Sequence, residues 1–170
     1  MKMSINRLVR KMFHDDQNWD DLAFFREITI FHGLHNRQLR RVLQAMQKRK
    51  YFAGEIVFQE GQAGKAVFVI RSGGVELSRR GSADKEKVLA RLGPGQMFGE
   101  MALLENQPRT ATARVAEDGE LYLLYTSTLE ALLRRDPAIG VVIMKNIASV
   151  LSALLRKSNE ERDKERGVKP

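Results

Sequence analysis

The sequence contains no cysteine, which excludes a disulfide framework, a zinc site with thiolate ligands and thiol chemistry. Histidine is scarce as well: His32 and His35 lie three residues apart, and no further histidine or cysteine completes a metal-binding set with them. No apolar run approaches the length of a membrane span, and the N-terminus lacks the apolar core of a signal peptide. These absences predict no metal site and no transmembrane segment, with the cytoplasm as the default location.

Basic residues outnumber acidic ones by 29 to 21, which gives a formal net charge of +8. Such a charge is compatible with binding to nucleic acid or to an anionic membrane surface. Since no nucleic-acid recognition motif accompanies the charge, we interpret it as a basic surface that raises the local concentration of an anionic ligand. A chain of 170 residues, 43% of them hydrophobic, is long enough for one domain with a real core.

Helical patterns occupy the first part of the chain. Apolar residues at helical spacing predict an amphipathic helix over residues 5–13, whose other faces are basic. Such a helix can lie on a membrane or dock on a partner, but packing on its own domain or on a dimer mate is more common. A second helix is expected from about Asp20, and a third from Arg37 to about Gln47 with Asn36 as its cap.

From Lys48 the pattern changes to short apolar runs separated by glycine-rich turns, which favours an antiparallel roll or barrel. Two short strands are expected around Gly54, and residues 66–70 predict a continuous apolar strand. Ser72-Gly73-Gly74 is a hairpin signal, and a second turn is expected at Glu117-Asp118-Gly119.

The C-terminal part predicts a long helix from Ala138, after a break at Asp136-Pro137. Its apolar face is too broad for a free helix, so it must cover its own sheet or a dimer partner. Residues 158–170 are almost all charged or polar, and we expect them to fray. The apolar seam of this helix has coiled-coil-like spacing and consists of Ile143, Ile147, Val150 and Leu154.

The most informative stretch runs from Gly93 to Val115. Gly99 precedes a short helical turn, where main-chain N–H groups can approach an anion closely. Arg109 follows Pro108, whose fixed φ aims the chain, and its planar guanidinium matches a phosphate bidentately. The carboxylate of Glu100 suits a ribose hydroxyl. Together these residues predict a pocket for one sugar-phosphate, and the alternative is a surface turn with a solvated Glu and Arg.

The segment Phe98-Gly99-Glu100-Met101-Ala102-Leu103-Leu104, followed by Pro108-Arg109-Thr110-Ala111-Thr112, resembles the phosphate-binding cassette of the cyclic nucleotide-binding domain family. That family includes kinase regulatory subunits, cyclic-nucleotide-gated channels and catabolite-activator-type transcription factors. The resemblance implies an α+β fold: an antiparallel, jelly-roll-like β-roll (a double-stranded β-helix) flanked by N-terminal helices and a long C-terminal helix. It also implies a helical extension over 1–30, the binding domain with its lid helix over 31–156, and a charged tail over 157–170.

The resemblance assigns roles to single residues. Glu100 is expected to take the ribose 2′-OH and Arg109 the cyclic phosphate, while main-chain amides at Gly99 and Ala102 assist. In the family's cGMP-binding members a threonine follows the arginine, as Thr110 does here, but bacterial cAMP sensors tolerate Ser or Thr at this position. We expect cAMP as the ligand, with cGMP next. The full implied ligand-binding set is Phe98, Gly99, Glu100, Met101, Ala102, Arg109, Thr110 and Ala111.

The implied function is that of a regulatory sensor, not an enzyme, which needs no cofactor and converts cyclic nucleotide binding into helix rearrangement. Because neither a DNA-binding domain nor transmembrane helices accompany the domain, we expect a stand-alone sensor or a part of a longer protein. Its expected partner is a second copy or another protein, bound through the N- or C-terminal helix. One alternative is an interaction module that uses no nucleotide. The other is a cupin-like metal enzyme, disfavoured because all three histidines precede the strands.

Overall fold

The computed structural model describes residues 20–81, 86–103 and 107–165, and the predicted helix over 5–13 lies outside this range. The chain forms two compact units. One is Arg40–Arg135, which contains the whole β-sheet, and the other combines the helical residues that precede and follow it.

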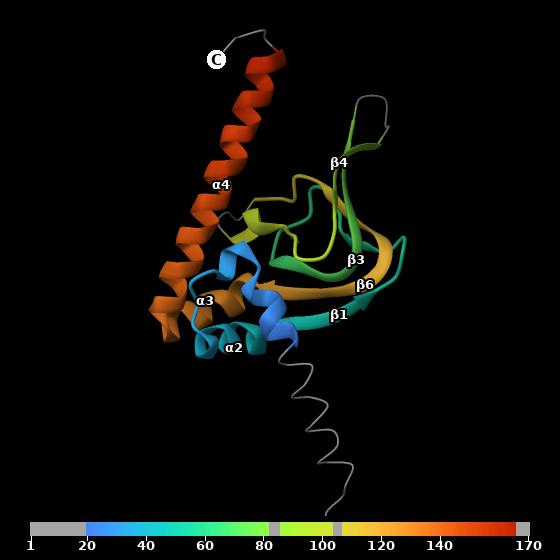
Figure 1. The fold of residues 1–170 in the computed structure, drawn as a ribbon. Helices are drawn as coiled ribbons and strands as arrows, with labels where there is room; N and C mark the ends of the chain where they lie inside the picture. Colours follow the sequence, from blue (N-terminus) through green and yellow to red (C-terminus); the bar gives the residue numbers. More distant parts are fainter. Residues whose placement is uncertain (1–19, 82–85, 104–106, 166–170) are drawn as a thin grey trace, which may run out of the picture. The chain divides into compact units, whose positions relative to one another are not determined.

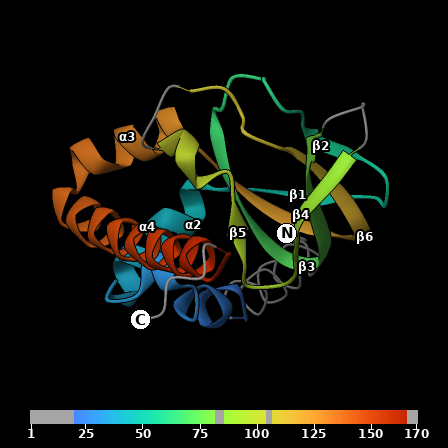
Figure 2. The same ribbon diagram turned by 90° about the horizontal axis from the view of Figure 1, so that it is seen from above.

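The sheet unit is built from six antiparallel strands, which Figures 1 and 2 show from two sides. The strand order is β1-β6-β3-β4, while β2 pairs with β6 and β5 pairs with β3. A short 3-10 helix, η3 (Glu100–Leu103), follows β5, and α3 (Thr126–Arg135) follows β6. This antiparallel sheet with flanking helices confirms the predicted fold class. The strands are β1 (Gln47–Tyr51), β2 (Ile56–Phe58), β3 (Ala66–Arg80), β4 (Glu86–Leu92), β5 (Met97–Phe98) and β6 (Thr112–Tyr125).

The two turns predicted at glycine-rich positions are wrong, because β3 and β6 each run through them as one long strand (Figure 1). The two strands pair from Ala66↔Tyr125 to Ser78↔Thr112, with register shifts opposite the glycines. A Cβ on Gly73 would lie 2.6 Å from the carbonyl oxygen of Asp118. Glycine is therefore needed where the two backbones approach closely and bend, rather than where the chain reverses.

The core of the sheet unit lies on the inner face of the roll. Three phenylalanine rings gather at one end of it: the rings of Phe68 and Phe98 stack with centroids 5.1 Å apart, and the ring of Phe58 lies 5.6 Å from that of Phe68. Burial of apolar surface in this cluster favours closing of the sheet. The buried cluster is Tyr51, Ala66, Phe68, Ile70, Val75, Phe98, Ala113, Val115, Leu121 and Leu123.

The helix before the sheet, α2 (Asn36–Ala45), is shorter than predicted because β1 already begins at Gln47. Asn36 is the first helical residue and not the cap; its side-chain oxygen accepts a hydrogen bond from Arg26. The helix is capped at His35, whose N–H donates to the side chain of Gln38 at 3.0 Å. In a capping box the side chain of the third helical residue accepts from the N–H of the cap residue, so the bond between Gln38 and His35 is one of the two hydrogen bonds of that motif.

The helical unit contains a helix over residues 20–26, the 3-10 helix η1 (Thr29–Phe31) and α4 (Pro137–Glu165). Pro137 occupies the first position of α4, where its missing N–H costs nothing. The side chain of Asn146 donates hydrogen bonds to the carbonyl oxygens of Ile30 at 3.1 Å and His32 at 2.8 Å, which fastens α4 to η1. From the predicted seam, Ile143 and Ile147 are buried.

The charged C-terminal segment is helical through Glu165, so the prediction that it frays from Ser158 is wrong. Glu, Lys and Arg are good helix formers, and Arg162 donates to the side chain of Asn159, one turn earlier, at 3.1 Å. One stretch of α4, Pro137–Glu160, contains an 18-residue window with a mean hydropathy of 2.0, so by length and composition it could cross a bilayer, which corrects our expectation of no such run. Core helices of soluble proteins meet the same criterion of length and composition.

Candidate functional site

The segment that carries Arg109, residues 107–111, is called the binding arm. Within the sheet unit, it lies beside the loop that follows β2. The N–H of Arg109 donates to the carbonyl of Gln62 at 2.7 Å, and the N–H of Gly61 donates to the carbonyl of Arg109 at 2.9 Å. Pro108 and Ala63 form an isolated antiparallel bridge next to this pair. The main chain of Arg109 is therefore fixed on one side by the loop 61–63.

The side chain of Arg109 is buried, with 9% of its surface exposed. One terminal nitrogen, Nη1, donates to the carbonyl of Gly99 at 3.1 Å, and the other, Nη2, donates to the carbonyl of Ala66 at 2.7 Å. The guanidinium lies over the ring of Phe58, 4.0 Å from the ring centroid, and 5.8 Å from that of Phe68. Its Nε is shielded from solvent and has no hydrogen-bond partner among the residues that the structure describes.

The electrostatic position of Arg109 is unusual for a cation. Burial lowers the pKa of Arg109, and the negative charge of Glu100 opposes that shift in part. Within residues 20–81, 86–103 and 107–165, no carboxylate forms an ion pair with this guanidinium. A guanidinium has five N–H donors, and two main-chain carbonyls use only part of that capacity. The site thus holds a largely desolvated positive charge that an anion could compensate.

Arg109 and Glu100 both line a cavity of about 350 Å³ in the sheet unit. Six of the eight predicted ligand-binding residues contribute to its wall: Gly99, Glu100, Met101, Arg109, Thr110 and Ala111. Their assignment to a ligand stays a prediction, but they surround one space.

The other two predicted residues have different positions. Phe98 is buried and stacks on Phe68, and it is not among the residues that line the cavity. Ala102 lies in η3, and its side chain is outside what the structure describes. Sequence reasoning missed four lining residues: Phe58, Leu77, Gln107 and Pro108. Gln107 and Pro108 adjoin Arg109 in the chain, so proximity alone could have found them.

Gly99 has a second role that the sequence did not reveal. Its φ is 75°, in the left-handed region that favours glycine. A Cβ at this position would lie 2.6 Å from Nη1 of Arg109 and 3.3 Å from the carbonyl oxygen of Ala66. The missing side chain therefore leaves room for the arginine to reach both carbonyls.

Comparison with known proteins places this site in a family. The family model of the cyclic nucleotide-binding domain matches residues 48–136. The cyclic AMP receptor protein of Thermus thermophilus is 38% identical over 134 residues, which are 79% of this chain and 60% of that protein. This chain therefore spans less than two thirds of that relative's length.

Two solved structures support the same grouping. The catabolite activator protein of Thermus thermophilus superimposes with a TM-score of 0.72 at 38% identity, over 79% of this chain and 62% of that one. The regulatory domain of Toxoplasma gondii PKA, solved with cAMP, gives a TM-score of 0.64 at 32% identity, over 69% of this chain and 44% of that one. The residues that the family model matches include all those that line the cavity, Arg109 among them. This chain belongs to the cyclic nucleotide-binding domain family.

Proposed function

We propose that the cavity binds a cyclic nucleoside monophosphate, with Arg109 on the phosphate and Glu100 on the ribose 2′-OH. The observation that carries this proposal is the buried guanidinium of Arg109, which faces the cavity without a carboxylate partner in the described part of the chain. A cyclic phosphate is a monoanion that would compensate this charge and accept from the remaining N–H groups. In the same wall, Glu100 offers the acceptor that a sugar hydroxyl requires.

The size and the walls of the cavity support a ligand of this class. About 350 Å³ lies within the range of small-molecule sites, which is about 300–1,000 Å³. Phe58, Leu77 and Met101 provide apolar surface for a sugar and a flat base, while Glu100 and Arg109 provide the few polar groups that fix orientation. An interaction module without a ligand gives no reason for a buried cation beside a hollow of this size.

We propose cAMP as the preferred nucleotide, with cGMP as the weaker ligand. The relatives support this choice, since one is named as a cyclic AMP receptor protein and another was solved with cAMP. Thr110, which follows Arg109, lines the cavity and leaves cGMP as a candidate because its hydroxyl can contact a guanine amino group.

We propose a regulatory role and no catalysis: the bound nucleotide changes the arrangement of the helices that follow β6 in the chain. Among the residues that the structure describes, no group of three or more His, Cys, Asp or Glu side chains could hold a metal ion. The cupin-like alternative, which needs such a cluster on the strands, therefore has no support in this range.

Isothermal titration calorimetry of the purified chain with cAMP, cGMP and 5′-AMP tests the proposal. We expect one cAMP per chain with a Kd in the micromolar range or tighter, weaker binding of cGMP, and little binding of 5′-AMP. Excess cAMP should also stabilise the fold, by about 2.7 kcal/mol at a hundred times its Kd. Native mass spectrometry beforehand shows whether nucleotide has co-purified. Absence of binding and of thermal stabilisation with both cyclic nucleotides would contradict the proposal.

The role of Glu100 gives a separate prediction. Glu100→Ala should weaken cAMP binding about tenfold or more, because a hydrogen bond to a charged acceptor is lost. Removing the hydroxyl from the ligand should have a similar effect, so 2′-deoxy-cAMP should bind the unaltered protein weakly and bind the Glu100→Ala variant no worse than cAMP. Glu76→Ala, on β3 outside the cavity wall, is the matched control and should leave affinity within about twofold. Equal affinity of the unaltered protein for both ligands would refute this role.

A further inference from the structure

The ladder between β3 and β6 ends at the pair Ser78↔Thr112, and Thr112 directly follows the last residue of the binding arm. Beyond this point β3 continues beside β4, with the pairs Arg79↔Lys87 and Arg80↔Glu86. The arm separates from β3 there, so main-chain groups that a longer ladder would pair need other partners. The chain supplies these partners from side chains.

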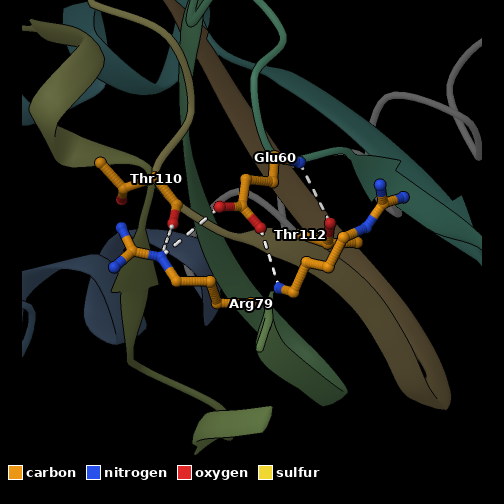
Figure 3. A network of polar contacts seen from close by, with 5 residues as sticks. Glu60, Arg79, Thr110 and Thr112 are labelled. Atoms are coloured by element: carbon orange, nitrogen blue, oxygen red, sulfur yellow. Dashed lines mark hydrogen bonds and ion pairs between the residues drawn. The ribbon is translucent and has the colours of Figure 1, made fainter. Parts of the chain in front are cut away.

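Two charged side chains take the places of the missing ladder bonds, as Figure 3 shows. Nε of Arg79 donates to the carbonyl of Thr110 in the arm at 3.0 Å. The carboxylate of Glu60 accepts from the N–H of Arg80 at 3.0 Å and lies 3.5 Å from Nε of Arg79. The main-chain N–H of Glu60 donates to the hydroxyl of Thr112 at 3.0 Å. We call Glu60 and Arg79 the arm clamp.

The arm clamp joins three segments that are distant in sequence. Glu60 belongs to the loop after β2, which also bonds the main chain of Arg109. Arg79 belongs to the far end of β3, two residues after Leu77, which lies in the cavity wall. The carbonyl that Arg79 holds belongs to Thr110, between Arg109 and Ala111, and all three of these line the cavity.

We propose that Glu60 and Arg79 are positioning residues of the ligand site: they hold the arm so that Arg109 and Thr110 are in place before a ligand arrives. This inference rests on the proposed function. The two side chains are 35% and 53% exposed, so an ion pair between them adds little to fold stability. We expect Glu60 and Arg79 to raise ligand affinity by preorganisation. An arm that is free to move would have to become ordered when the ligand binds, which lowers the affinity.

The test measures cAMP affinity and dissociation rate for Arg79→Ala, Glu60→Ala and the double variant. Each single variant should bind about five- to tenfold more weakly, mainly through faster dissociation, and the double variant should lose little more than one single. Glu76 and Arg91 form the matched control, since they are a cross-strand pair on β3 and β4 with a nitrogen–oxygen distance of 3.0 Å. Arg91→Ala and Glu76→Ala should stay within about twofold of the unaltered protein.

A charge-retaining variant separates positioning from the attraction of an anion by net charge. Arg79→Lys keeps the positive charge but loses the planar guanidinium, so it should also dissociate faster. The positioning proposal is wrong if Arg79 acts through charge alone. In that case Arg79→Lys would have the association and dissociation rates of the unaltered protein. Arg79→Ala and Arg91→Ala would slow association equally, and added salt would abolish this effect.

Hydrogen exchange in the ligand-free protein tests the arm clamp without any nucleotide, because it measures how firmly the amides of the arm are held. Amides of residues 109–112 should exchange faster in Arg79→Ala and Glu60→Ala than in the unaltered protein, and at an unchanged rate in Arg91→Ala. If the unaltered protein binds no cyclic nucleotide, the proposed function fails, and the exchange rates alone then test whether Glu60 and Arg79 hold the arm. Whether or not a nucleotide binds, unchanged exchange in both clamp variants would show that they do not hold it.

Discussion

Arg109→Ala is expected to weaken cAMP binding by at least about a hundredfold, as measured by isothermal titration calorimetry. Truncating one partner of a buried charged pair typically costs on the order of 2–5 kcal/mol. The buried guanidinium contacts only carbonyl oxygens and aromatic rings among its described neighbours, so we expect the phosphate to be its main charged partner. Loss of this side chain would leave the phosphate desolvated without compensation.

Two further variants make the Arg109 prediction specific. Arg109→Lys keeps the charge but replaces the planar guanidinium, whose Nη1 and Nη2 donate to two separate carbonyls, with a single nitrogen, so it should lose at least about tenfold in affinity. Arg91→Ala removes the same charge from an exposed pair and should retain affinity. Thermal unfolding of each variant verifies that it folds. A folded Arg109→Ala protein with unaltered affinity would show that the phosphate does not bind at Arg109.

Gly119→Ala is expected to have the largest effect on stability, at least about 3 kcal/mol by urea denaturation. A Cβ on Gly119 would lie 2.0 Å from the carbonyl oxygen of Ser72, 2.6 Å from its carbonyl carbon and 2.8 Å from Cα of Gly73. All three neighbours are main-chain atoms of β3, so no side-chain rotation can relieve the overlap. The two longest strands of the sheet would have to separate at the point where both bend.

Gly93→Ala is the matched control for this substitution. A Cβ on Gly93 meets no atom within 4 Å, and its φ is outside the left-handed region. We therefore expect a change within about 1 kcal/mol in either direction. If Gly119→Ala and Gly93→Ala unfold at the same urea concentration as the unaltered protein, the close approach of β3 to β6 at Ser72 is incorrect.

The glycines show how far the sequence could predict this fold. Gly73 and Gly119 carry the local chemistry of a turn, and sequence reasoning placed a turn at each. The same chemistry, a missing Cβ and freedom at positive φ, also suits a close crossing of two strands. Only the long-range pairing of β3 with β6 distinguishes a turn from a close approach of two strands, and a local sequence pattern does not identify the partner of a strand.

The residues of the site likewise fall into those that a local motif could predict and those that depend on long-range strand pairing. Gly99, Glu100 and Arg109 belong to one continuous motif, so the sequence could place them together, and the structure has them in the wall of one cavity. Phe58 and Leu77 reach the cavity from β2 and β3, and their contribution depends on strand register. The pairing of Glu60 with Arg79 depends on where the β3–β6 ladder ends, which no local pattern indicates.

The most direct test of the account is the side-chain ¹⁵N–¹H resonance of Arg109 Nε during a titration with cAMP. The variant Arg109→Lys identifies the signal by its disappearance. Since this N–H has no partner in the described part of the chain, we predict a large shift that saturates with the Kd given by calorimetry, as expected for a new hydrogen bond to the phosphate. A resonance that stays in place while calorimetry reports saturated binding would contradict the account.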